Sequence, residues 1–278
     1  MKTILAIIKM SRPINLVITF ATVFVASLIC NTQQNISVEV FFASLSAMLV
    51  AAAGNIINDI FDLEIDKINK PNRSLPAGET TKRNAIIFYL LFSVSAIMIS
   101  SLINIAAIVI VTVTSLLLFF YSFKLKAVPL IGNLTVAVCT GLAFIYGGVA
   151  VGNWKLGIIP AVFAFLINLI RELLKDIEDL EGDLKNKVIT FPGKYGIDKT
   201  KSLIIMITVF LIVTTFYPFI YKIYSIEYFL IVLFGVDLIL VYFLKELNKK
   251  NFLEKISKLS NYLKLSMILG LIAIYFGL

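Results

Sequence analysis

Histidine is absent from the 278 residues of this chain, and cysteine occurs only twice, at Cys30 and Cys139. Zinc and haem sites draw mainly on histidine and cysteine, so such sites have almost nothing to use here. The two cysteines lie in or at the ends of apolar segments and have no CxxC partner, which favours simple packing over a disulfide. A metal bound by this chain must therefore be held by oxygen.

Charged residues are also scarce, because they make up 15% of the chain whereas hydrophobic residues make up 59%. A soluble domain of this size carries about a quarter charged residues. The hydrophobic residues form long uncharged runs, several of them close to the ~20 residues that span a bilayer. The sequence therefore predicts an all-α polytopic membrane protein, in one domain over residues 1–278.

Nine transmembrane helices are predicted from these runs. Their expected bounds are 13–31, 38–57, 84–103, 105–121, 128–150, 156–174, 202–221, 226–244 and 259–278. Two of the runs meet at Asn104 without a charged loop. Together they are too long for one crossing of a ~30 Å hydrocarbon core, so a tight hairpin is expected there.

Basic residues indicate the orientation of the chain. With the N-terminus in the cytoplasm, nine spans leave only Lys155 and Lys222 of the 25 basic residues on the outer side. The positive-inside rule favours that orientation. The net charge of +8 follows from this topology, so no nucleic-acid partner is expected. The chain is predicted to be a multi-pass protein of the cell membrane.

Two acidic stretches share one pattern. The first motif reads NDIFDLEID over residues 58–66, and the second motif reads KDIEDLEGD over residues 175–183, 117 residues later. In register, the acids of the first and second motifs are Asp59, Asp62 and Asp66, and Asp176, Asp179 and Asp183. Acids three and four residues apart fall on one face of a helix, where their charges repel. A divalent cation held by carboxylate oxygens would offset this repulsion.

Both motifs are expected on the cytoplasmic side, where the second and sixth spans end. The shared pattern and the four-helix offset suggest an internal parallel duplication. Two carboxylate clusters at the mouth of a helical bundle can hold Mg²⁺ and leave positions open for substrate phosphates. The alternative is that these acids are solvated charges at helix ends. Two copies in register, in a chain with 17 acids, favour the metal site.

Basic residues accompany the acids in three segments. These are Lys67, Lys70 and Arg73 in KINKPNRSLPAG, Lys124 and Lys126 in YSFKLK, and Lys185, Lys187 and Lys194 after the second motif. Taken singly, each also suits a topology anchor at the lipid headgroups. Together with Mg²⁺, such a group would neutralise a departing diphosphate.

Polar side chains inside the predicted spans are few, and each needs a partner or a wet cavity. They are Asn15, Asn55, Asn133, Asn168 and Asp237. For the asparagines, hydrogen bonding between helices and a role in a site are both open. A lone carboxylate near mid-membrane is costly, so Asp237 is expected to pair with a tyrosine or to be protonated.

The motifs carry a resemblance to the UbiA-type intramembrane prenyltransferase superfamily. Besides the two acidic motifs and KINKPNRSLPAG, the supporting runs are SRPIN at 11–15, YSFKLK at 121–126 and PLIGN at 129–133. The superfamily's NxxxDxxxD falls on Asn58, Asp62 and Asp66, and its DxxxD falls on Asp179 and Asp183. Lys175 departs from relatives that carry asparagine there, which argues against a metal ligand at that position.

This resemblance implies a fold, a reaction and a site. The implied fold is a nine-helix bundle around a cavity that holds a polyprenyl chain, capped by cytoplasmic loops. Two Mg²⁺ would bridge the carboxylates to a prenyl diphosphate, whose ionisation leaves an allylic cation for an acceptor to attack. The implied catalytic residues are Asp62, Asp66, Asp179 and Asp183. The implied metal ligands are Asn58, Asp59, Asp62, Asp66, Asp176, Asp179 and Asp183. The implied substrate contacts are Asn58, Arg12, Asn15, Lys70, Arg73, Tyr121, Lys126, Tyr146 and Lys187, the tyrosines as cation–π walls.

The first motif and its basic run most resemble the archaeal, ether-lipid branch of the superfamily. That branch moves a geranylgeranyl group from its diphosphate to the sn-2 hydroxyl of geranylgeranylglyceryl phosphate. Lys9, Arg12 and Lys187 are available for the phosphate of such a membrane-lipid acceptor. Two alternatives remain open: an aromatic-acceptor prenyltransferase of quinone biosynthesis, and a secondary transporter. Transporter sites usually lie at the bilayer midplane, whereas both acidic motifs are expected at the cytoplasmic end of the helical bundle.

Overall fold

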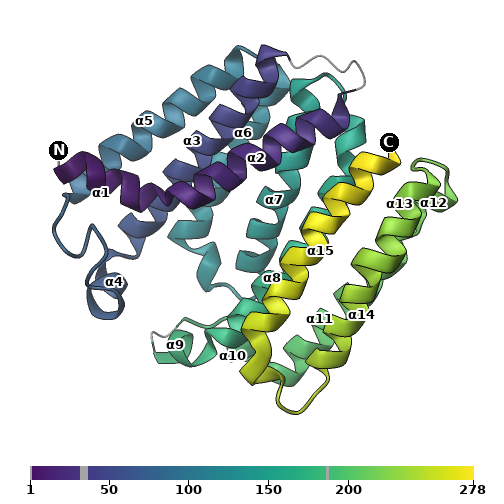
Figure 1. Ribbon diagram of the computed structural model, residues 1–278. Helices are drawn as coiled ribbons and strands as arrows, with labels where there is room; N and C mark the ends of the chain where they lie inside the picture. Colours follow the sequence, from purple (N-terminus) through teal and green to yellow (C-terminus); the bar gives the residue numbers. More distant parts are fainter. Residues whose placement is uncertain (1, 32–36, 186–187) are drawn as a thin grey trace. The chain divides into compact units, whose positions relative to one another are not determined.

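The protein is helical throughout the part of the chain that the structure describes. The computed structural model describes residues 2–31, 37–185 and 188–278, and none of them forms a β-strand (Figure 1). The long helices are α2 (Pro13–Cys30), α3 (Val38–Phe61), α5 (Lys82–Ser101), α6 (Ile105–Phe123), α7 (Ile131–Ala150), α8 (Ile158–Glu178), α11 (Ile197–Thr215) and α15 (Ile256–Gly277). The shorter ones are α1 (Lys2–Ser11), α4 (Leu63–Asn69), α9 (Leu180–Lys185), α10 (Phe191–Tyr195), α12 (Tyr217–Ile220), α13 (Ile226–Ile231) and α14 (Leu238–Leu247).

The predicted number of membrane spans is confirmed. Within the described residues, nine helical segments are long and apolar enough to cross a membrane. Four of these segments contain more than one element. Trp154–Glu178 and Phe252–Gly277 each begin with a 3-10 turn before α8 and α15, Ile197–Ile220 includes α11 and α12, and Ile226–Leu247 includes α13 and α14. The predicted hairpin at Asn104 is also present, since α5 ends at Ser101 and α6 begins at Ile105. The Asn104 side chain accepts a hydrogen bond from the Ala107 amide at 2.9 Å and caps α6.

Two helices continue past their predicted ends. The second span was expected to stop at residue 57 and the sixth at residue 174, but α3 reaches Phe61 and α8 reaches Glu178. The apolar face continues through these extra turns, since Ile60 and Ile177 are both buried. Each helix therefore carries the first residues of an acidic motif on regular backbone.

The chain forms two compact units. The first contains Met1–Leu125 and Leu142–Ile158, and the second contains Lys126–Gly141 and Ile159–Leu278. The predicted single domain over residues 1–278 stays a prediction.

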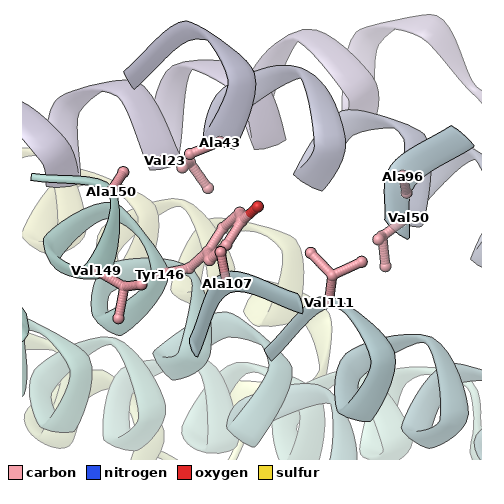
Figure 2. Packing of buried hydrophobic residues seen from close by; sticks show 9 residues of the cluster. All are labelled: Val23, Ala43, Val50, Ala96, Ala107, Val111, Tyr146, Val149 and Ala150. Carbon is pink, nitrogen blue, oxygen red and sulfur yellow. The ribbon is translucent and has the colours of Figure 1, made fainter. Parts of the chain in front are cut away.

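In the first unit, α3 is the central helix and packs against α1, α2, α5 and α6 (Figure 1). One buried cluster lies between these helices and the second half of α7. In it the Tyr146 ring lies among the side chains of Val23, Ala43 and Ala107 (Figure 2). Its hydroxyl bonds to the Ser46 hydroxyl at 2.5 Å, so the one polar group of this ring is satisfied inside the cluster.

In the second unit, α13 and α14 pack against α15, and α11 packs against α14. Between α13 and α14 the backbone forms a π-helical segment, Val232–Asp237, which ends on the buried Asp237. The Thr215 hydroxyl lies 3.3 Å from both carboxyl oxygens of Asp237. The partner of this mid-span acid is therefore a threonine on α11 and not the expected tyrosine.

Close approach of α7 and α2 in the first unit depends on Gly147. A Cβ atom at that position would lie 2.7 Å from the Ala26 Cβ and 2.7 Å from the Ser27 amide nitrogen. We predict that Gly147→Ala lowers the melting temperature of the detergent-purified protein, because overpacking of this kind costs ~1–3 kcal/mol. Gly270→Ala is the control, since a Cβ there meets no atom within 4 Å. Equal melting temperatures for the two variants would contradict the packing account.

Candidate functional site

The first acidic motif lies across a break between two helices. Helix α3 ends at Phe61, Asp62 is the junction, and α4 begins at Leu63. The one-turn spacing survives this break, because the Asp62 amide donates to the Asn58 carbonyl at 2.9 Å and the Asp66 amide to the Asp62 carbonyl at 2.7 Å. The Asn58 side-chain amide also donates to Asp62 Oδ2 at 2.9 Å. Asn58, Asp62 and Asp66 therefore follow one another at one-turn intervals, as their spacing predicted.

The second motif repeats this local geometry in its own unit. Helix α8 ends at Glu178, Asp179 is the junction, and α9 follows. The Asp179 amide donates to the Lys175 carbonyl, and the Asp183 amide to the Asp179 carbonyl, both at 2.9 Å. A helix break at the equivalent aspartate in both copies agrees with the in-register repeat read from the sequence. In this register Lys175 is the counterpart of Asn58.

Two arginines compensate the buried acids of the first motif. Arg73 Nη1 lies 2.6 Å from Asp66 Oδ2 and 3.4 Å from Asp59 Oδ1, and Arg12 Nη2 lies 2.9 Å from Asp59 Oδ1. Asp59 and Asp66 are only 6% and 4% exposed. A buried carboxylate is costly unless it is paired and hydrogen-bonded, and these contacts give both acids such partners. The pairing of Asp59 with two guanidinium groups, and of Asp66 with one, competes with the predicted role of both acids as metal ligands.

Arg12 reaches α3 because of an unusual backbone conformation. Its φ angle is 57°, in the left-handed region that non-glycine residues seldom adopt, and it connects α1 to Pro13 at the start of α2. Its second guanidinium nitrogen donates to Asn55 Oδ1 at 3.1 Å, and the Asn55 amide donates to the Ser11 carbonyl at 2.8 Å. The turn between α1 and α2 is thus tied to α3 by side chains, and these contacts offset its backbone strain.

The segment after the first motif is held in place by Glu79. The Ser74 hydroxyl donates to Glu79 at 2.8 Å, and Lys9 Nζ donates to the same carboxylate at 3.0 Å. Hydrogen bonds from Ser74 and then Lys9 lower the pKa of Glu79 below its ordinary value. Lys9, which the sequence offered for an acceptor phosphate, therefore has an intramolecular partner.

The environment of the second motif differs from that of the first. The Asn133 amide donates to Asp176 Oδ2 at 2.9 Å, which joins the PLIGN run to the motif within the second unit. Burial and the neighbouring Asp179 carboxylate raise the pKa of Asp183, whereas Lys175 acts in the opposite direction. The carboxylates of this motif thus repel one another, and a bound cation would relieve that repulsion.

The remaining predicted contacts fall in several places. Asn15 is exposed in the first turn of α2, and Lys70 is exposed at the end of α4. Tyr121 is half-buried near the end of α6, and Lys126 is half-buried in a 3-10 turn, Leu125–Ala127, of the second unit. Lys187 lies outside the described residues. Their roles in substrate binding stay predictions.

The donor set fits Mg²⁺ bound together with a substrate. Among the residues described, no group of three or more histidine, cysteine or acidic side chains is gathered to hold a metal. Magnesium in proteins is often bound through one or two carboxylates, several waters and substrate phosphates. Each motif offers two carboxylates one turn apart, Asp62 and Asp66 in one and Asp179 and Asp183 in the other. That supply matches the shared, oxygen-only coordination that Mg²⁺ favours.

Several residues of this site escaped the sequence-based prediction. In the sequence, Asn55 and Asn133 stand out as polar residues of spans, and Asn133 also ends the PLIGN run, but neither is among the predicted site residues. Their partners, Arg12 and Asp176, are 43 residues away in each case. For Asn55 a signal existed, because it lies one turn before Asp59 on the same helix.

Known proteins resemble this chain over almost its whole length. Residues 19–268 match the model of the UbiA prenyltransferase family. A digeranylgeranylglyceryl phosphate synthase of Methanosphaera stadtmanae is 34% identical over 272 residues, 97% of this chain and 98% of that protein. One of Sulfurisphaera tokodaii is 36% identical over 276 residues, 98% of this chain and 97% of that protein.

Solved structures agree with these sequence similarities. A digeranylgeranylglyceryl phosphate synthase structure superposes with a TM-score of 0.86 at 33% identity, covering 100% of this chain and 99% of that one. A UbiA homologue from Archaeoglobus fulgidus, solved with GPP and Mg²⁺, gives a TM-score of 0.71 at 17% identity and covers 95% and 99%. The second likeness concerns the fold alone. Fold and motifs thus define a multi-pass membrane prenyltransferase. The chain belongs to the UbiA prenyltransferase family, and the resemblance read from its sequence is confirmed.

Loss of Arg73 should destabilise the first unit. Arg73→Ala leaves Asp66 without its guanidinium partner and Asp59 with only one. Breaking a fully buried ion pair costs ~3–5 kcal/mol, and because Arg73 is 30% exposed we expect about 2 kcal/mol. The measurement is thermal unfolding in detergent, with Arg83→Ala as the control because Arg83 is an exposed arginine of the same unit. Equal stability of the two variants would show that the acids do not depend on Arg73.

Proposed function

We propose that this protein is a Mg²⁺-dependent prenyltransferase that moves a geranylgeranyl group from geranylgeranyl diphosphate to the sn-2 hydroxyl of geranylgeranylglyceryl phosphate. The observation that carries this assignment is the end-to-end similarity to digeranylgeranylglyceryl phosphate synthases, at 34% identity over 97% of the chain. The site chemistry agrees with it, because both acidic motifs have the oxygen donors that a diphosphate and its metal require.

The proposed catalytic residues are Asp62, Asp66, Asp179 and Asp183, which would hold two Mg²⁺. When bound, the metal supplies positive charge that stabilises the departing diphosphate. The chain prepares for this in the first unit, where Asn58 orients Asp62 through its amide hydrogen bond and Arg73 pairs with Asp66. The carboxylates of the first motif would thus be fixed before substrate arrives, and both motifs would serve one reaction.

Arg12 and Arg73 have a second proposed role besides pairing the acids. Arg73 is 30% exposed and Arg12 is 36% exposed, so both guanidinium groups retain access to a ligand. Guanidinium nitrogens bind phosphate oxygens with charge-assisted hydrogen bonds. Lys70, Lys126 and Tyr121 remain proposed contacts of the donor. We place the motif-bearing ends of the helices in the cytoplasm, as the distribution of lysine and arginine favours.

Acceptor identity can be tested with separate reactions. Purified protein is given Mg²⁺ and geranylgeranyl diphosphate with either geranylgeranylglyceryl phosphate or an aromatic acid. The proposal expects an ether-lipid product and diphosphate release only with the phosphate-bearing acceptor. Transfer to the aromatic acid alone would assign the protein to quinone biosynthesis instead. Diphosphate release that depends on substrate, in detergent without a membrane, would also separate the enzyme from a transporter.

The two motifs offer matched variants for the catalytic assignment. Asp62→Ala should reduce turnover by at least about 100-fold, in the range seen when a group that stabilises transition-state charge is removed. Glu64→Ala is its control, because Glu64 pairs with the exposed Lys67 at 2.8 Å. Asp179→Ala and Glu181→Ala form the same comparison in the second motif, because Glu181 is the exposed counterpart of Glu64 in that motif.

Turnover is measured at saturating Mg²⁺ on protein with an unchanged melting temperature. Near-normal activity of Asp62→Ala would refute the assignment of the first motif. Equal losses in the aspartate and glutamate variants would show that the effect is one of net charge.

A further inference from the structure

A pocket in the second unit is lined by three basic side chains, one of which is Lys175 of the second motif. It has a volume of about 170 Å³ and lies between α8 and α15. Its wall includes Arg171, Lys175 and Asp179 from α8 and the following turn, and Ser260 and Lys264 from α15. One bound water needs only ~10–15 Å³ measured in this way, so the pocket has room for a polar headgroup.

The register of the two helices explains why these residues meet. Arg171 and Lys175 are one turn apart on α8, and Ser260 and Lys264 are one turn apart on α15. Side chains four residues apart lie on the same face of a helix, so each helix presents two polar groups to the pocket. Arg171 lies two turns inside its span, ~10 Å from Glu178 along the axis. Ionisable residues at such positions are expensive and mark functional sites.

Arg171 is oriented but incompletely bonded. Its Nη1 donates to Asn168 Oδ1 at 3.2 Å, and the Asn168 amide donates to the Thr140 hydroxyl at 3.0 Å. Its Nε is buried and, within the described residues, has no hydrogen-bond partner. A buried donor without a partner costs free energy unless a ligand or water fills the place. The guanidinium group is thus held in position by α7 and α8 with donor capacity to spare.

The three cations of the lining are matched by three acids, and Asp179 of the second motif is one of these acids. Glu172 and Glu178 are the other two, but no ion pair joins them to Arg171, Lys175 or Lys264 among the residues described. Among the described residues, Lys264 makes one hydrogen bond, to Asn261 Oδ1 at 3.3 Å. Three cations and the Ser260 hydroxyl can together bind the oxygens of a phosphate monoester, whose charge-assisted hydrogen bonds are among the strongest in proteins.

We propose that this pocket binds the phosphate of the lipid acceptor, an inference that rests on the proposed function. Lys9 and Arg12, which the sequence offered for that phosphate, are bonded to Glu79 and Asp59 instead. Asp179 borders the pocket and belongs to the second motif. The acceptor headgroup would thus be fixed next to this motif, and Lys175 would supply a cation where the first motif has Asn58.

Lys264→Gln is the sharpest test, because this side chain is exposed and its loss should leave the fold intact. The KM for geranylgeranylglyceryl phosphate should rise roughly ten-fold, the effect of one lost charge-assisted hydrogen bond, while the KM for geranylgeranyl diphosphate stays unchanged. Arg171→Gln should behave likewise, and Arg171→Lys should recover part of the loss. Lys250→Gln, at an exposed loop position, is the control and should match the wild type.

An acceptor without its phosphate, geranylgeranylglycerol, separates binding from structure. Wild type and Lys264→Gln should bind geranylgeranylglycerol with equal affinity in calorimetric titrations without Mg²⁺ or donor. The wild type should bind geranylgeranylglyceryl phosphate about ten-fold more tightly than it binds geranylgeranylglycerol. Equal affinity of the wild type for both lipids, or an unchanged acceptor KM in both variants, would overturn the pocket assignment and leave the proposed function standing.

The opposite outcome is also distinguishable. Suppose that phosphate-dependent binding is lost in Lys264→Gln but the wild type transfers no geranylgeranyl group to geranylgeranylglyceryl phosphate. This result would support the pocket and reject the proposed function. Competition then identifies the source of the phosphate. Inorganic phosphate should displace the acceptor weakly, whereas vesicles of an anionic phospholipid should not displace it. Efficient displacement by such vesicles would make the pocket a site for bulk lipid and overturn its role in acceptor binding.

Discussion

Compensation of buried negative charge at the end of α3 organises the first unit. Asp59 and Asp66 are almost fully buried, and each would be costly without a cation. Arg12 and Arg73 supply that charge from two segments far apart in sequence, the turn before α2 and the loop after α4. The same two contacts therefore offset the negative charge of the motif and hold the flanking segments against it. Asp62 is oriented separately, by its hydrogen bond from Asn58. Structure and reactivity depend on one network.

The two motifs repeat in sequence and in backbone geometry but differ in their counter-charges. Arginines from neighbouring segments balance the first motif, whereas the second has the Asn133 amide and the lysine of its own helix, Lys175. An aspartate junction is common to both, so the metal-binding chemistry can be shared. The surrounding cations can then differ between the motifs, so that one set binds the diphosphate of the donor and the other binds the phosphate of the acceptor.

Much of this could be predicted from the sequence. Long apolar runs separated by basic loops located nine spans, and the one-turn spacing of acids survived even the helix breaks at Asp62 and Asp179. Helix ends were misjudged at residues 57 and 174, because hydropathy marks where apolar residues stop rather than where hydrogen bonding stops. Contacts such as Arg12 with Asp59 join residues 47 positions apart, and no local pattern encodes them. The left-handed backbone of Arg12 was equally invisible, since only packing selects it.

The most direct test of the account is a competition in one reaction. Purified protein receives labelled geranylgeranyl diphosphate, Mg²⁺, and equal concentrations of geranylgeranylglyceryl phosphate and an aromatic acid, and mass spectrometry identifies every labelled product. The account predicts a single labelled product, the phosphate lipid with a second geranylgeranyl ether at sn-2, and none when Mg²⁺ is chelated. A labelled aromatic product, or an ether lipid formed equally well without Mg²⁺, would contradict it.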